Sequence, residues 1–182
     1  TYSYAAAEVI IPHVLGGNLM EILTLQTSWQ SVCGNTKLMV AFGGLPVFNS
    51  QMSNGGTGLH IQRNAVRDAA AAGTRFVNLS PRRSDIKTEI DEDWVHLRPN
   101  TDVAVMLAMC HTLLVEGLHD QAFLDRYTTG FDKFAAYLRG AGDDTPKTAA
   151  WAAAISGMAA DEIITLSRQM AAERTMLTVS WS

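Results

Sequence analysis

The chain has 182 residues, of which 47% are hydrophobic and 18% charged, so it is long enough to bury one substantial core and falls within the globular range. The net charge of −4 comes from interspersed acids and bases, and no run of Lys or Arg forms the basic stripe of a nucleic-acid groove. Nucleic acid is therefore not an expected partner. Direct membrane insertion is not expected either, because polar residues and glycines break the apolar runs well short of the roughly 20 residues that span a bilayer.

The chain termini and the Cys and His residues set further expectations. The chain begins at Thr1 without a signal-like region and stops at Ser182 directly after an apparent strand, so we expect both ends to be cuts through a longer polypeptide. Cys33 and Cys110 are far apart and have no CxxC partner, which predicts buried free thiols. The five histidines show no HxxxH or HxH spacing, and no metal ligand is assigned.

The first half of the chain predicts a βαβ unit. Residues 1–35 form an N-terminal helical segment, with a helix over 3–14 that Pro12 should end or kink. The apolar run 37–42 is typical of a parallel strand buried on both faces. A long loop rich in Gly, Asn and Ser, a helix over 59–72 and a second strand over 74–79 follow. This order predicts parallel strands joined by a right-handed crossover.

The second half predicts a third strand, several helices and a returning strand. The strand covers 94–97, and Asn100 or Thr101 is positioned to cap a long helix over 102–116. Further helices are expected at 120–127, 131–138, 148–155 and 160–172, and a last strand at 176–180. The predicted fold class is α/β, a Rossmann-like parallel sheet with flanking helices and a small helical annex. Its parts are a dinucleotide-type core over 36–118, the annex over 119–174 and the returning strand over 175–182.

Polar residues and glycines gather where the predicted strands end. In a doubly wound sheet the ligand crevice lies beyond the carboxyl ends of the strands. Glycines permit close backbone approach, whereas hydroxyls, amides and guanidinium groups suit phosphate and ribose. The strand ends carry Gly43-Gly44, Ser80-Pro81-Arg82-Arg83-Ser84, Arg98-Pro99-Asn100-Thr101-Asp102 and Trp181-Ser182.

These strand ends favour binding over catalysis. The loop after the first strand lacks GxGxxG, and the second strand ends in Ser80 instead of an acid, which argues against a simple NAD enzyme. Arg82 and Arg83 either hold a phosphate or form a solvated turn. Asp102 is either a dipole-favourable cap residue or a partner for a guanine edge. Because no GxSxG elbow, P-loop or nucleophile–base set is present, no catalytic residue is assigned.

Several long segments, in the same order along the chain, resemble a known family. They are YSYAAAEVIIPHVLGG, the TSW at Thr27–Trp29, NLSPRRSD, PNTDVAVMLAMCHTLLVEGLHDQAFLDRYTTGF and KTAAWAAAISG. Together they cover nearly the whole chain. They resemble the molybdopterin oxidoreductases related to dimethyl sulfoxide, trimethylamine N-oxide and biotin sulfoxide reductases.

The resemblance implies a fragment of an enzyme with a bis(molybdopterin guanine dinucleotide) molybdenum cofactor, which passes electrons and an oxygen atom between substrate and water. The implied partners are the remainder of the parent polypeptide, a small S-oxide or N-oxide substrate and an electron donor such as a c-type cytochrome. The residues implied to face the cofactor are Gly43, Gly44, Asn49, Leu79, Ser80, Pro81, Arg82, Asp102, Trp181 and Ser182. The molybdenum ligand and the rest of the cofactor cradle are implied to lie outside this segment, which alone is expected to be inactive.

Two departures from the family pattern stand out: Ser80 takes the place of a carboxylate and Leu45 the place of an Asn. Ser80 is expected to bind ribose less strongly than a charged acceptor would. Two alternatives stay open, namely a stand-alone α/β module that binds a nucleotide or phosphate without redox activity, and an enzyme remnant without cofactor contacts. By family resemblance the expected compartment is the periplasm, with the cytoplasm as the alternative.

Overall fold

A computed structural model describes residues 5–24, 26–46, 60–84, 86 and 90–179, and the backbone alone at 52–53, 56–57 and 85. Its centre is a parallel sheet of β1 (Leu38–Phe42), β4 (Arg75–Leu79), β5 (Asp93–Val95) and β6 (Thr175–Val179). The strand order is β5-β4-β1-β6, and every neighbouring pair is parallel. The predicted α/β class is confirmed. Because the strand order reverses at β1, the topological switch point lies between β1 and β6.

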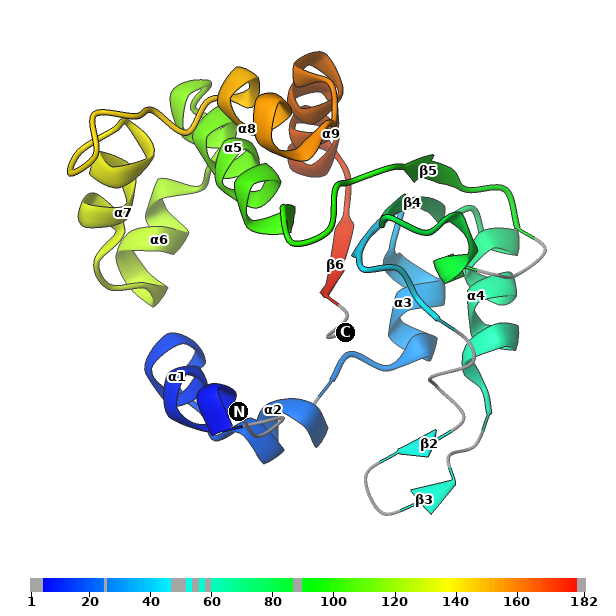
Figure 1. The fold of residues 1–182 in the computed structure, drawn as a ribbon. Helices are drawn as coiled ribbons and strands as arrows, with labels where there is room; N and C mark the ends of the chain where they lie inside the picture. Colours follow the sequence, from blue (N-terminus) through cyan, green and yellow to red (C-terminus); the bar gives the residue numbers. More distant parts are fainter. Residues whose placement is uncertain are drawn as a thin grey trace.

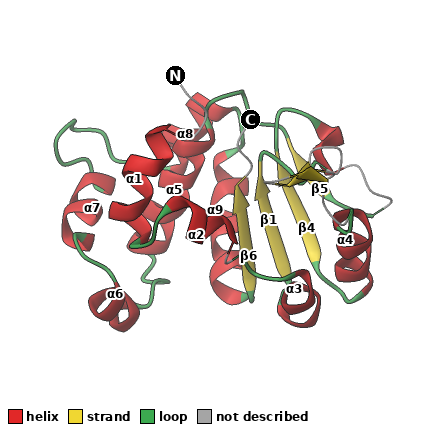
Figure 2. Cartoon of the chain, turned by 90° about the horizontal axis from the view of Figure 1, so that it is seen from below, coloured by secondary structure: helices red, strands yellow, loops and turns green. Residues whose placement is uncertain are grey.

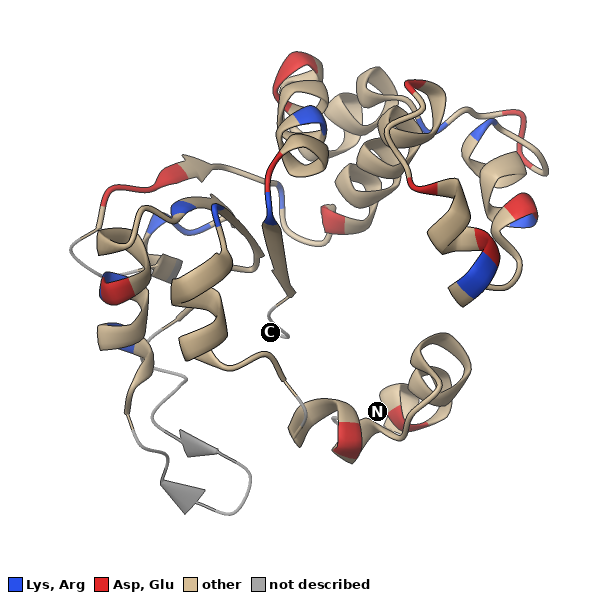
Figure 3. Cartoon of the chain, turned by 180° about the vertical axis from the view of Figure 1, so that it is seen from behind, with Lys and Arg blue, Asp and Glu red and all other residues tan. Residues whose placement is uncertain are grey.

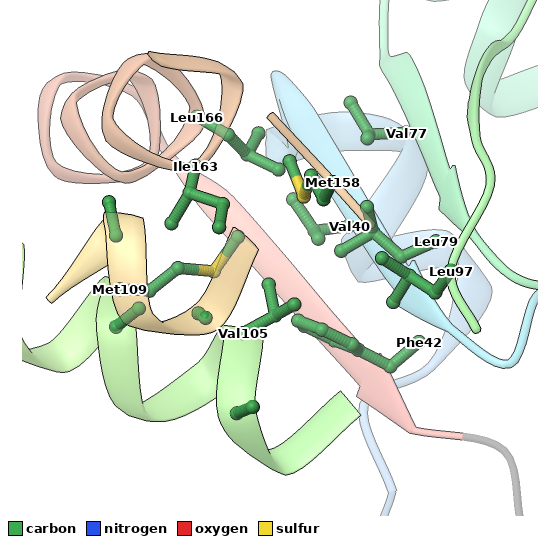
Figure 4. Close-up of a cluster of buried hydrophobic side chains, with 14 of the residues drawn as sticks. Val40, Phe42, Val77, Leu79, Leu97, Val105, Met109, Met158, Ile163 and Leu166 are labelled. Carbon is green, nitrogen blue, oxygen red and sulfur yellow. The ribbon is translucent and has the colours of Figure 1, made fainter. Parts of the chain in front are cut away.

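Successive side chains along the strands point to opposite faces of the sheet, and helices cover both faces, as Figure 2 shows. On one face Val40, Phe42 and Leu79 pack against α5 (Asp102–Val115), α8 (Ala149–Ser156) and α9 (Ala160–Ala172), as the close-up in Figure 4 shows. On the other face Met39, Ala41 and Phe76 pack with α3 (Trp29–Asn35) and α4 (Gln62–Ala71). The helices thus fix the sheet from two sides.

Helix α5 has the apolar face that its sequence predicts. Val105 and Met109 are buried in the main core, whereas Met106, Cys110 and Leu113 are half-buried. Thr101 is the N-cap residue, but its side chain makes no capping hydrogen bond to the helix, so only the position of the predicted cap is confirmed. Both cysteines are free and half-buried, and burial raises the pKa of the Cys110 thiol.

The helices after α5 divide between two clusters. α6 (Gln121–Tyr127) and α7 (Phe131–Leu138) follow the chain away from the sheet in Figure 1, and Ala135 and Leu138 form a small cluster with Leu114 of α5. By contrast, α8 and α9 supply Ala152, Ile163 and Leu166 to the main core. Of the helices in residues 119–174, α8 and α9 thus cover the sheet, whereas α7 packs against α5 in the smaller cluster. The division into domains stays a prediction.

The N-terminal segment and the loop after β1 contain elements that sequence reasoning missed. α1 (Ala5–Leu15) retains Pro12 inside the helix and buries none of its residues, and α2 (Leu19–Thr24) buries only Leu19. α2, α3 and the 3-10 turn η2 (Arg83–Ile86) were not predicted. The loop contains an antiparallel pair, β2 (Met52–Ser53) and β3 (Gly56–Thr57).

Acidic and basic residues are interspersed along the described chain, as the colours in Figure 3 show. Residues 1–36 carry no Lys or Arg at all. Within the described ranges no single helix is long and apolar enough to cross a membrane. The bent pair α8–α9 meets the requirement by length and composition only, and the two helices bend by 119° at their junction.

Candidate functional site

The carboxyl end of β1 turns sharply through two glycines. Gly43 has φ of 79° and Gly44 has φ of 74°, both in the left-handed region that favours glycine because a Cβ would clash there. The Gly43 amide donates to the carbonyl of Leu79 over 2.9 Å, so the turn stays joined to the end of β4. The two predicted glycines therefore bring backbone to the sheet edge beside the switch point, where a dinucleotide binds in this architecture.

The turn after β4 is built around Ser80, which is completely buried. The Ser80 hydroxyl accepts a hydrogen bond from the Arg82 amide at 3.2 Å, and its carbonyl accepts one from the Trp94 indole at 3.0 Å. These bonds shape the turn and leave Pro81 and Arg82 exposed, while Leu79 is buried. In this structure Ser80 holds the turn together; its predicted contact with ribose stays a prediction.

Asp102 opens α5 seven residues after β5 ends at Val95. It is half-buried, at the positive end of the helix dipole. Asn100, two residues earlier, has φ of 63°, a conformation that Asn tolerates better than most side chains. The structure thus places the predicted carboxylate after a strand, at the same sheet edge as the two turns described above.

A cavity of about 160 Å³ lies against the β1–β6 pair. Polar and apolar side chains line it together. They come from α3 and the segment before it, from both strands, from the turn after β1 and from the start of α4: Gln26, Thr27, Trp29, Val32, Met39, Leu45, Gln62, Met176 and Thr178. The sequence indicated Thr27 and Trp29 by the family resemblance and Trp29 also as a core residue, but it gave no signal for Gln26 or Gln62. Ser28, whose side chain caps α3 at the Ser31 amide, was the local signal for the helix that positions Trp29.

Two polar side chains lie next to each other near the Ser80 turn, from Asn78 in β4 and from Glu92, the residue before β5. Asn78 is completely buried and its amide donates to the Arg83 carbonyl at 3.5 Å. Among the described residues, Asn78 Oδ1 and Glu92 Oε2 are buried without a hydrogen-bond partner. Burial raises the pKa of the Glu92 carboxyl, while the charge of Arg83 and a hydrogen bond from Asn78 act in the opposite direction.

Three of the predicted cofactor-facing residues, Asn49, Trp181 and Ser182, lie outside the described residues. The others lie at one edge of the sheet: Gly43, Gly44, Leu79, Ser80, Pro81, Arg82 and Asp102. Within the described part of the chain, no group of three or more His, Cys, Asp or Glu side chains is placed to hold a metal ion. This edge of the sheet therefore presents four kinds of group: the accessible backbone of the glycine turn, the turn held by the Ser80 hydroxyl, the guanidinium of Arg82 and the carboxylate of Asp102.

The sequence is similar to curated reductases along its whole length. It is 44% identical to the dimethyl sulfoxide/trimethylamine N-oxide reductase of Cereibacter sphaeroides over 183 residues. It is 37% identical to the biotin sulfoxide reductase of the same organism and 37% identical to the trimethylamine-N-oxide reductase of Haemophilus influenzae. These alignments cover 99–100% of this chain but only 22–24% of the relatives, so the chain spans less than a quarter of their length.

A solved structure has a similar fold, and a family profile points to the same kind of protein as these relatives. The acetylene hydratase of Pelobacter acetylenicus superimposes with a TM-score of 0.59 over 82% of this chain and 18% of its own, at 22% identity, which shows a shared fold. The profile of the molybdopterin oxidoreductases matches residues 17–182. The chain therefore belongs to the molybdopterin oxidoreductase family.

Proposed function

We propose that this chain holds the guanine-nucleotide end of a molybdopterin guanine dinucleotide in a larger molybdenum oxidoreductase that reduces S-oxides or N-oxides. The observation that carries the proposal is the convergence of the glycine turn, the Ser80 turn and Asp102 at the carboxyl edge of a sheet with a β1–β6 switch point. Membership of the family favours this function over a stand-alone nucleotide-binding module.

The residues at this edge fit a guanine dinucleotide by their chemistry. Gly43 and Gly44 let phosphate approach the backbone, and the exposed guanidinium of Arg82 supplies a positive charge for it. Asp102 has two carboxylate oxygens, the acceptor pair that suits the paired N–H donors of guanine. The family's usual carboxylate at the Ser80 position is absent, so Asp102 is the acid that we assign to the base.

The cofactor would supply electron and oxygen-atom transfer, and this chain would orient it. We further propose a small S-oxide or N-oxide as the substrate and a second guanine dinucleotide held mainly by the rest of the parent polypeptide. The periplasm as the compartment and a c-type cytochrome as the electron donor rest on the family resemblance alone. All of these belong to the complete enzyme, of which the segment alone is expected to be inactive.

The exposed apolar surface of α1 supports a larger parent protein. Val9, Ile10 and Val14 are 67%, 55% and 68% exposed, on a helix that buries none of its residues. Apolar side chains gathered in this way on one helix mark an interaction surface. We propose that polypeptide outside this segment covers α1, because the relatives are more than four times as long as the alignment.

The test is the molybdenum and guanine content of the full-length protein, purified from a host that makes the cofactor. We expect about one metal and two guanines per chain, as the bis(guanine dinucleotide) form requires. A protein with molybdenum but no guanine would keep the family and refute the dinucleotide form. A protein with neither would refute the proposed function and favour the cofactor-free remnant.

A further inference from the structure

Arg98, three residues after β5, connects the segment that leads to α5 with the C-terminus of α8. Its guanidinium Nη1 donates to the carbonyls of Ala154 at 3.0 Å and Ile155 at 3.1 Å. Its own amide donates to the carbonyl of Ser156 at 2.9 Å. One residue thus satisfies three successive carbonyls at the C-terminus of a helix, where such groups lack intrahelical partners and a positive charge is favourable.

The α8 terminus has the shape that this contact needs. Gly157 ends the helix with φ of 82°, and its amide donates to the Ala153 carbonyl. A Cβ built on Gly157 would lie 3.6 Å from Arg98 Nε and 3.8 Å from Arg98 Cγ, so the arginine side chain passes directly over the glycine. The close approach fixes where the chain leaves β5 relative to α8.

The same residue closes the turn that leads to Asp102. The Thr101 hydroxyl donates to the Arg98 carbonyl over 2.6 Å, and between the two residues Asn100 is in the left-handed conformation. The Thr101 carbonyl then accepts from the amide of Ala104 in the first turn of α5. Backbone and side-chain contacts therefore run without a break from α8 through Arg98 to the residue before Asp102.

We propose that Arg98 is a positioning residue for the cofactor, which sets the Asp102 carboxylate against guanine by clasping the C-terminus of α8. The proposal rests on the proposed function, because it needs a guanine at Asp102. It differs from a direct phosphate contact by Arg98, since the guanidinium Nη1 is already used by two carbonyls. It also gives α8, which is remote in sequence from the strand ends, a part in holding the cofactor.

The test compares full-length variants loaded with cofactor, with the rate of guanine-nucleotide loss during dialysis as the readout. We expect Arg98→Met to lose guanine about tenfold faster than wild type, as loss of a charged hydrogen-bonded contact implies. Arg98→Lys should be intermediate, because it keeps the charge on a more flexible stem. Arg126→Met, on exposed α6, is the control and should behave as wild type.

The double variant decides between positioning and other roles. If Arg98 acts through Asp102, then Arg98→Met combined with Asp102→Ala loses guanine no faster than Asp102→Ala alone. Additive rates would overturn the proposal and indicate a direct contact or a general loss of stability; so would an Arg98→Met rate equal to wild type. A wild-type protein without guanine would refute the proposed function itself, which is a separate outcome.

Discussion

Helices α1 and α5 are both rich in apolar residues, yet α1 buries none of its residues whereas α5 buries six. The difference lies in what covers them. α5 packs against α8 and α9 and shares one core with them and with the sheet, whereas Val9 and Val14 of α1 are about two-thirds exposed. An apolar composition predicts that a helix will be buried. Which part of the protein covers the helix depends on the surface that packs against it. For α1 we assign that surface to the rest of the parent enzyme.

The largest effect should come from a charge inside the α5 core. Val105 is completely buried, so Val105→Asp places an unpaired carboxylate among apolar side chains and should cost about 4 kcal/mol or more. Urea unfolding of the full-length protein, followed by circular dichroism, measures the loss. Val103→Asp is the matched control, because Val103 is on the same helix and 65% exposed. Equal losses in the two variants would contradict the assigned buried face.

The corresponding change in α1 tests the proposed cover. In the full-length protein we expect Val9→Asp to cost about 3 kcal/mol, close to a core substitution, although Val9 is 67% exposed in this segment. The same urea unfolding measurement applies. Glu8→Gln, at the neighbouring exposed residue, should leave the stability nearly unchanged. A Val9→Asp protein as stable as wild type would show that this face of α1 meets water in the parent.

Elements defined by local patterns were predicted well from sequence. The five-residue strand β1 was expected one residue longer, and α5 was expected to end one residue later than it does. These two elements can be recognised locally. A continuous apolar run indicates a strand buried on both faces, and apolar residues at helical spacing indicate a helix with one buried face. α2 was missed because it has only six residues, too few to show a period.

Properties that depend on contacts distant in sequence were not predictable. The position of α9 on the sheet depends on Ile163 and Leu166 meeting Val40 and Leu79, more than 80 residues earlier in the chain. In the candidate site, the strand ends indicated Gly43 and Asp102. The hydrogen bonds from Arg98 to α8 and the burial of Ser80 required the tertiary structure.

A smaller effect on stability is expected at Asp102, the polar first residue of α5. Asp102→Asn keeps the shape of the side chain but replaces one acceptor oxygen with a donor, so it should weaken guanine retention by about tenfold. Stability should fall by only about 0.3–1 kcal/mol, the range of a helix-dipole contact. Guanine content after dialysis and thermal unfolding of the full-length protein measure the two effects. Unchanged guanine content would remove Asp102 from the proposed site.

The smallest effect concerns Glu92, the residue before β5, which lies next to Asn78 of β4. Burial raises the pKa of the Glu92 carboxyl above its ordinary value of 4.5, so the folded state prefers the protonated form. The stability associated with that preference is fully present below the unfolded pKa and is lost as the pH rises through the folded pKa. At pH 7 the charged, partly buried carboxylate therefore destabilises the fold.

Glu92→Gln removes this charge while keeping the size of the side chain, so the variant should be slightly more stable than wild type at pH 7. The advantage should shrink as the pH falls and disappear below about 4, where the wild-type carboxyl is protonated in both states. Thermal unfolding between pH 4 and 7 measures the difference, and Asp91→Asn, at the neighbouring exposed acid, is the control. A variant less stable than wild type at pH 7 would mean that the Arg83 charge and the Asn78 hydrogen bond outweigh burial at Glu92.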